Sequence, residues 1–143
     1  MKNIGYVRCS TTKQENSVET QTKLITDFCN THEIKLDEFI VDEGISGSGE
    51  KTNKRDGYNR VINMIENNEI DTLVVVSISR WGRNLGEIYN SVNLMTDKGI
   101  KFLSIKENID TSSPYGRFTI NLLSSNREFI SNIIHIRPIG GFR

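Results

Sequence analysis

The chain alternates between short apolar runs and longer segments in which apolar residues recur every three or four positions. The short runs predict strands, and the amphipathic segments predict helices. The predicted strands cover residues 2–9, 35–42, 71–77 and 100–105. The predicted helices run from Ser17 to about His32, from Arg55 to Asn67, from Asn84 to Asp97, and over residues 114–137. This alternation predicts an α/β fold with a mostly parallel central sheet flanked by helices.

The last predicted helix differs from the others because no strand follows it. Pro138 and two glycines end it, so we expect one domain over residues 1–137, a short tail at 138–143 and no DNA-binding domain in this sequence. Phe118, Leu122 and Phe129 recur at helical spacing. A single terminal helix cannot bury such a face, which predicts dimerisation through this long C-terminal helix.

The first predicted strand ends in an unusual row of polar side chains. Alternate residues of a strand share a face, so Tyr6, Arg8 and Ser10 point one way and Cys9 points the other. Such a row suits an attack on a phosphate, with Ser10 as nucleophile, Arg8 as clamp and Tyr6 as positioning group. Cys9, the rival nucleophile, is interpreted as a small core residue. Taken alone, a strand-end serine beside a solvated arginine would carry no function.

Further polar groups follow the other predicted strands, where ligands meet a parallel sheet. Arg80 and Arg83 are three residues apart, so we place them on one helical face beside a helix N-terminus that suits a phosphate. Arg55 follows a glycine- and serine-rich loop, and loop closure would bring it over the site. Asp42 belongs either to the site or to a loop cap, and the sequence leaves both open.

Composition narrows the class of protein. The 143 residues are 36% hydrophobic and 25% charged, typical of one globular domain. Lysine plus arginine and aspartate plus glutamate both number 18, which excludes a uniformly basic surface but allows a local basic patch. Two distant cysteines predict reduced thiols in an intracellular, cytoplasmic protein, and we expect no membrane span. No acidic cluster predicts a metal site, so charge stabilisation would fall to arginine.

Five motifs in this order carry a resemblance to a known family. They are Tyr6-Val7-Arg8-Cys9-Ser10-Thr11 with Gln14, then Asp42-Glu43-Gly44-Ile45-Ser46-Gly47, Lys54-Arg55-Asp56-Gly57, Ser79-Arg80-Trp81-Gly82-Arg83-Asn84, and Ile109-Asp110-Thr111-Ser112-Ser113-Pro114-Tyr115-Gly116-Arg117. Together they resemble the catalytic domain of serine recombinases, the resolvase/invertase group. The resemblance covers roughly residues 3–129.

The resemblance implies a site-specific recombinase, often encoded by a mobile element, that cuts and rejoins double-stranded DNA without metal or nucleotide cofactor. Ser10 would attack a phosphodiester and form a 5′-phosphoserine link, and strand exchange would occur in a tetramer of two dimers. Arg8, Arg80 and Arg83 would bind the scissile phosphate. The supporting residues would be Arg55, which assists from the loop, and Tyr6, Gln14 and Asp42, which position the site. DNA binding by the chain alone would be weak.

The sequence departs from the family pattern in two places. Ser79 stands where the family usually has an aspartate, and Ile130-Ser131 stands where it commonly has Glu-Arg. These departures favour an alternative function, a catalytically weak or inactive truncated recombinase that acts only as a dimerisation module. A small-molecule phosphotransferase with a flavodoxin-like sheet is disfavoured, because Thr11-Thr12-Lys13 is not a glycine-rich phosphate loop.

Overall fold

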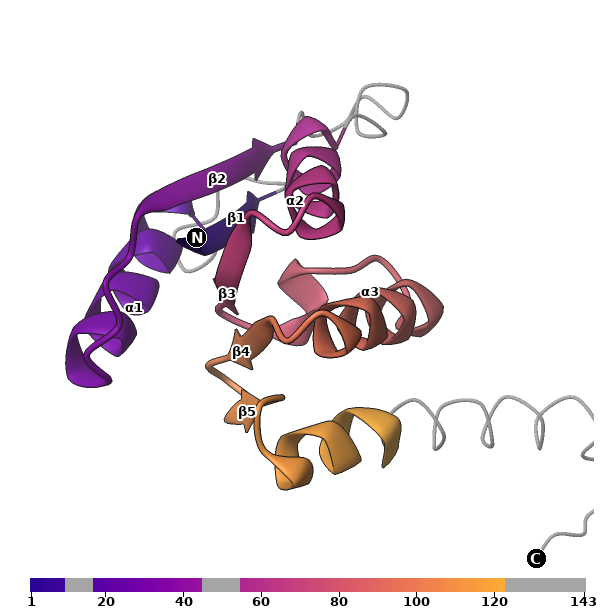
Figure 1. The fold of residues 1–143 in the computed structure, drawn as a ribbon. Helices are drawn as coiled ribbons and strands as arrows, with labels where there is room; N and C mark the ends of the chain where they lie inside the picture. Colours follow the sequence, from indigo (N-terminus) through magenta and orange to yellow (C-terminus); the bar gives the residue numbers. More distant parts are fainter. Residues whose placement is uncertain (10–16, 45–54, 123–143) are drawn as a thin grey trace, which may run out of the picture.

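A computed structural model of the chain describes residues 1–9, 17–44 and 55–122. Five strands form one sheet: β1 (Lys2–Cys9), β2 (Glu38–Glu43), β3 (Ile70–Val75), β4 (Lys101–Ser104) and β5 (Ile109–Asp110). Their order is β2-β1-β3-β4-β5 (Figure 1). The first four strands are parallel and β5 is antiparallel to β4, so the predicted mostly parallel sheet is confirmed.

Helices follow β1, β2, β3 and β5 along the chain. They are α1 (Val18–Thr31), α2 (Asp56–Glu66), α3 (Leu85–Asp97), the short 3-10 helix η3 (Ile78–Arg80) and a helix that begins at residue 114 and is described to residue 122. Ser17 caps α1 by accepting from the Thr20 amide at 3.0 Å, as its position predicts. No helix in the described part of the chain has the length and apolar character that a membrane crossing requires. The predicted extension of the last helix to residue 137 and the tail lie outside the described residues.

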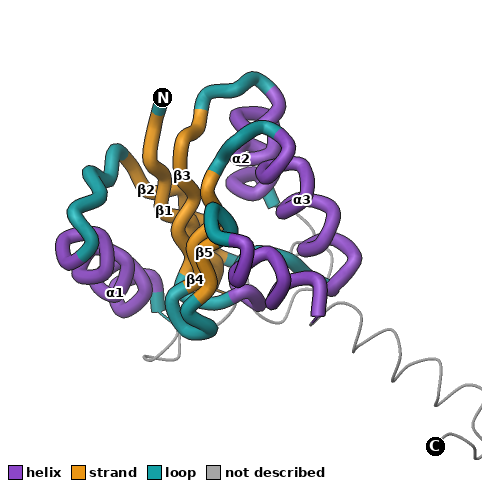
Figure 2. The backbone as a smooth tube through the Cα atoms, turned by 60° about the horizontal axis from the view of Figure 1, so that its bottom comes forward, coloured by secondary structure: helices purple, strands orange, loops and turns teal. Residues whose placement is uncertain are grey.

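The sheet separates two apolar cores. On one face α1 packs Ile25 and Cys29 against Val7 of β1, whereas α2 and α3 cover the opposite face, which includes Tyr6 (Figure 2). Tyr6 and Val7 are adjacent in sequence and lie in different cores. The predicted alternation of side chains along β1 is therefore confirmed.

Three details differ from the sequence-based prediction. β2 begins at Glu38 rather than at residue 35, because the Asn3 side chain binds the Lys35 carbonyl at 2.9 Å and holds the preceding segment as a connection. Leu24 lies at helical spacing with the apolar residues of α1, but it is 40% exposed, and Cys29 is buried on that helix instead. The two-residue strand β5 and the 3-10 helix η3 were not predicted because both are too short to show a period.

The helix that begins at residue 114 is anchored by a close backbone approach. A Cβ atom on Gly116 would lie only 2.0 Å from the carbonyl oxygen of Asp110 in β5, so only glycine fits there. Ile120, one turn later, is buried against the core shared with α2 and α3. Tyr115, Phe118 and Leu122 point away and are 74%, 60% and 46% exposed, so this helix presents a largely uncovered apolar face.

We predict that Gly116→Ala lowers the free energy of unfolding by about 2 kcal/mol or more, because the helix must move away from β5 to relieve the clash. Denaturant unfolding measures the change. Gly86→Ala in α3 is the matched control, since its Cβ would meet nothing closer than 3.4 Å. The control should be neutral or stabilising by about 0.5–1 kcal/mol. Equal effects of the two substitutions would contradict the close approach.

Candidate active site

The carboxyl ends of three parallel strands bring the candidate residues to one edge of the sheet. Arg8, near the end of β1, lies opposite Asp42 of β2 in the strand register. Arg80 ends η3, which directly follows β3. These groups come from segments up to 72 residues apart in the chain, and the parallel topology alone places them at the same edge.

Arg8 is the central cation of this edge. Its Nη2 donates to the carbonyl oxygen of Ser79, which joins β1 to η3. Burial lowers the pKa of the Arg8 guanidinium, and the positive charges of Arg80, Arg55 and Arg83 lower it further. Arg8 therefore lies within electrostatic range of three further guanidinium groups. Arg8 Nε is buried and has no hydrogen-bond partner among the described residues.

Asp42 and its three hydrogen-bond donors, Tyr6, Gly57 and Tyr58, form a cluster that we call the Asp42 bracket. The Tyr6 hydroxyl donates to Asp42 Oδ2 at 2.6 Å, and the backbone amides of Gly57 and Tyr58 donate to the same carboxylate at 2.7 and 2.8 Å. Asp42 thereby caps the N-terminus of α2, where Arg55 provides no side-chain cap. Burial, and then the bond to Asp42, raise the pKa of the Tyr6 hydroxyl, which stays protonated as a donor. Asp42 thus caps a helix rather than a loop, and this contact leaves its expected place in the site a prediction.

The expected placement of Arg80 and Arg83 on one helical face is wrong. Arg80 ends η3, whereas Arg83 lies in the loop before Asn84, the N-cap of α3. The chain turns between them because the indole of Trp81 enters the core, where Nε1 donates to Ser91 at 2.7 Å. Trp81 is fully buried and packs edge-on against Tyr6 with 5.2 Å between ring centroids, so it is a packing residue and not a base-stacking surface.

Arg55 is held by a residue that the sequence analysis did not single out. Its Nη1 and Nη2 donate to the two carboxylate oxygens of Glu87 at 2.8 and 2.9 Å. The Arg55 guanidinium also stacks on the Tyr58 ring, 3.9 Å from the centroid. The hydrogen bond to Arg55 lowers the pKa of Glu87, and the same bond raises that of Arg55. The available signal was the spacing of Asn84 and Glu87, which is typical of a helix capping box.

Two of the predicted site residues, Ser10 and Gln14, lie outside the described residues. Of the other six, Arg8 is coupled electrostatically to Arg55, Arg80 and Arg83. Tyr6 is hydrogen-bonded to Asp42 at the same edge of the sheet. Within residues 1–9, 17–44 and 55–122, no group of three or more histidine, cysteine, aspartate or glutamate side chains could hold a metal ion. In the described part of the chain, charged groups at this edge include the arginines, Glu87, Asp42 and Glu107, whose carboxylate accepts from the Ile78 amide of η3 at 3.2 Å.

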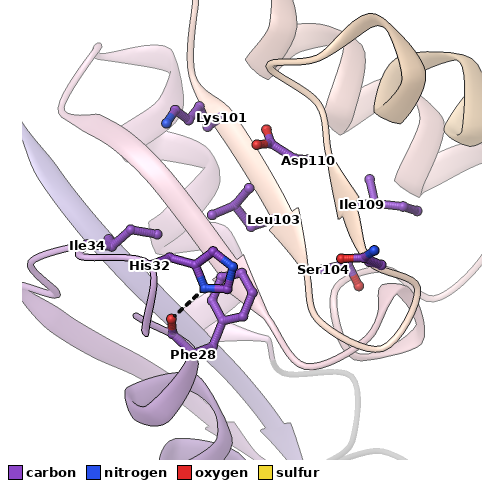
Figure 3. A pocket seen from close by; sticks show the side chains of 9 residues that line it. Phe28, His32, Ile34, Lys101, Leu103, Ser104, Ile109 and Asp110 are labelled. Carbon is purple, nitrogen blue, oxygen red and sulfur yellow. Dashed lines mark hydrogen bonds between the residues drawn. The ribbon is translucent and has the colours of Figure 1, made fainter. Parts of the chain in front are cut away.

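A separate cavity of about 290 Å³ lies beside the end of α1, next to β4 and β5 (Figure 3). Phe28 and Leu103, which line it, belong to the core on the α1 face of the sheet, whereas Tyr6 belongs to the opposite face. His32 lies over the Phe28 ring, and its Nδ1 is 2.9 Å from the Phe28 carbonyl oxygen. The arginines described above do not line this cavity, so it is not part of the candidate active site.

An α/β domain that gathers arginines at the carboxyl edge of a parallel sheet is a candidate for binding and reacting with a phosphate. Known structures share this fold. The N-terminal catalytic domain of TP901-1 integrase superimposes with a TM-score of 0.75 at 30% identity, covering 93% of this chain and 98% of that one. A resolvase family site-specific recombinase from Streptococcus pneumoniae gives a TM-score of 0.76 at 24% identity, covering 97% and 93%.

Sequence comparison gives the family. The family model "Resolvase, N terminal domain" matches residues 3–142, and this chain belongs to that family. The DNA-invertase of Escherichia phage P1 is 33% identical over 96% of this chain and 67% of its own length. The serine recombinase gin of Escherichia phage Mu is 31% identical over 96% and 64%. The family match extends beyond residue 129, where the motif resemblance ends, and includes the segment that we expected to depart from the family.

The contribution of the Asp42 bracket to stability can be measured by removing its hydrogen bonds. Tyr6→Phe removes one of three hydrogen bonds to Asp42 and should lower the free energy of unfolding by about 1 kcal/mol. Asp42→Ala removes all three and should lower it by about 3 kcal/mol. Tyr89→Phe, a change at an exposed tyrosine of α3, serves as control and should have no effect. A Tyr6→Phe variant as stable as wild type would show that the bond does not support the site.

Proposed function

We propose that this chain is the catalytic domain of a site-specific DNA recombinase, which cuts and rejoins double-stranded DNA through a phosphoserine at Ser10. The observation that carries the proposal is the position of Arg8, whose positive charge lies within range of three further arginines at the edge where β1 leads to Ser10. The chain spans about two thirds of the length of the recombinases that it matches, so the activity of the whole protein is part of this proposal.

The proposed reaction exchanges one phosphate ester for another. Ser10 Oγ attacks the phosphorus, loses its proton and forms a bond to it, while the bond to the 3′ oxygen breaks and that oxygen takes up a proton. Negative charge grows on the phosphate in the transition state, where preorganised arginines stabilise it most. Arg8, Arg80 and Arg83 act on the phosphate oxygens, Arg55 assists, and Tyr6, Gln14 and Asp42 position the site. Attack by a 3′ hydroxyl on the phosphoserine reverses these steps and rejoins the strand.

An alternative function, a module that only dimerises, is suggested by the serine at position 79. Its hydroxyl lies 3.1 Å from that of Ser77, and neither group supplies the carboxylic acid that the family usually places at this position. If the leaving oxygen therefore finds no proton donor, the chain would act only as a dimerisation module. The arginine cluster favours the catalytic function, because a module that only dimerises has no need of it.

Formation of a covalent adduct tests the reaction. Supercoiled plasmid DNA incubated with the protein at low salt, where phosphate contacts are strongest, should yield denatured DNA joined through Ser10, mapped by mass spectrometry. Ser10→Ala should form no adduct, because it removes the attacking oxygen. Cys9→Ala, which removes the rival nucleophile, should form it at the wild-type level. Absence of any adduct from the wild-type protein would support the dimerisation module.

Self-association is the second part of the proposal, because strand exchange between two sites requires a dimer and then a tetramer. The exposed face formed by Tyr115, Phe118 and Leu122 supports it, since burial of such a face favours association. We expect a dimer at micromolar concentration and a monomer for Phe118→Glu, measured by sedimentation equilibrium. Leu24→Glu, at an exposed site of α1, should remain dimeric. A wild-type monomer at every concentration would exclude this interface.

A further inference from the structure

Glu87 connects two of the arginines that the proposed reaction uses. Its carboxylate accepts from both Nη atoms of Arg55, and its Oε1 also accepts from the backbone amide of Arg83 at 2.8 Å. Asn84, the N-cap of α3, in turn binds the Glu87 amide at 2.8 Å. One carboxylate on the first turn of α3 therefore fixes the segment before α2 and the segment after η3 relative to each other.

We infer that Glu87 is a positioning residue for the reaction, one that sets the orientation in which Arg55 meets the phosphate. The inference deepens the proposed function and rests on it. Glu87 itself does not touch the substrate in this role. It acts through Arg55 and through the backbone of Arg83.

The geometry of the guanidinium supports this role. A guanidinium can bind two anions at once, because its two Nη atoms form one edge and Nε with an outer Nη hydrogen forms another. Glu87 occupies the first edge, and the Tyr58 ring fixes the plane. Arg55 Nε is buried and has no hydrogen-bond partner among the described residues. A phosphate oxygen that reached this second edge would satisfy it while the ion pair with Glu87 stays intact.

Glu87 is negatively charged, so a variant without this charge distinguishes the positioning role from a role in attracting DNA. A carboxylate beside Arg55 and Arg83 weakens the attraction of any anion, so removing its charge should strengthen DNA binding. Removing its hydrogen bonds should free Arg55 to leave the reactive orientation, and misplacement of a catalytic group by 1 Å can slow a reaction about 100-fold. Binding and chemistry should thus change in opposite directions in the same variant.

The test uses Glu87→Gln, which keeps the shape of the side chain, loses its charge and turns an amide donor toward Arg55. We expect the variant to bind a short DNA duplex at least as tightly as wild type and to form the covalent adduct with plasmid DNA at least tenfold more slowly. Glu66→Gln removes the same charge at the exposed far end of α2 and should leave the adduct rate unchanged. Thermal unfolding confirms that each variant is folded at the assay temperature.

A second measurement does not depend on recombination. In ¹⁵N-labelled wild-type protein, inorganic phosphate should shift the Nε–H resonance of Arg55, assigned with an Arg55→Lys variant, and Glu87→Gln should lose this shift. A folded Glu87→Gln variant with a wild-type or faster adduct rate would overturn the inference, as would a wild-type Arg55 resonance that does not respond to phosphate. If the wild-type protein forms no adduct, the proposed reaction fails, and the resonance alone decides whether Glu87 positions Arg55.

Discussion

The candidate active site depends on holding a partly buried arginine, Arg8, within range of three further positive charges. Arg8 is partly buried, and the charges of Arg55, Arg80 and Arg83 oppose its own. Guanidinium groups in water would separate, so the fold must hold them in place through other contacts. The Ser79 carbonyl holds Arg8, and Glu87 with the Tyr58 ring holds Arg55. An anion placed among these groups would relieve the repulsion, so the site favours an anionic ligand over a neutral one.

Hydrogen bonds to Asp42 of β2 hold the elements that carry these contacts in place. Asp42 receives three hydrogen bonds, from β1 through Tyr6 and from the first turn of α2 through Gly57 and Tyr58. A Cβ on Gly57 would lie 2.7 Å from Asp42 Oδ1, so glycine is needed for the helix to approach the carboxylate this closely. The Asp42 bracket fixes where α2 begins, and therefore the position of Arg55, which directly precedes that helix. The position of a candidate catalytic arginine thus depends on a capped helix end.

Local patterns in the sequence were enough to predict much of this arrangement. Side-chain alternation separated Arg8 from Cys9, and the apolar run of residues 71–77 predicted the strand that Arg80 follows. The pairing of Arg55 with Glu87 joins residues 32 positions apart, and no local period reports such a contact. Arg80 and Arg83 were misplaced on one helix because their spacing is helical, whereas the burial of Trp81 turns the chain between them. For Asp42, the sequence showed a carboxylate at a strand end but not which donors would reach it.

The most direct test of the central claim is whether an anion relieves the repulsion among the arginines. The midpoint of thermal unfolding can be measured while sulfate replaces chloride at constant ionic strength, for the wild-type protein and for Arg8→Gln. Because a ligand that binds only the folded state stabilises it, sulfate should raise the wild-type midpoint more than that of the variant. Equal shifts in the two proteins would reflect only the general effect of sulfate on protein surfaces and would contradict a preformed phosphate site.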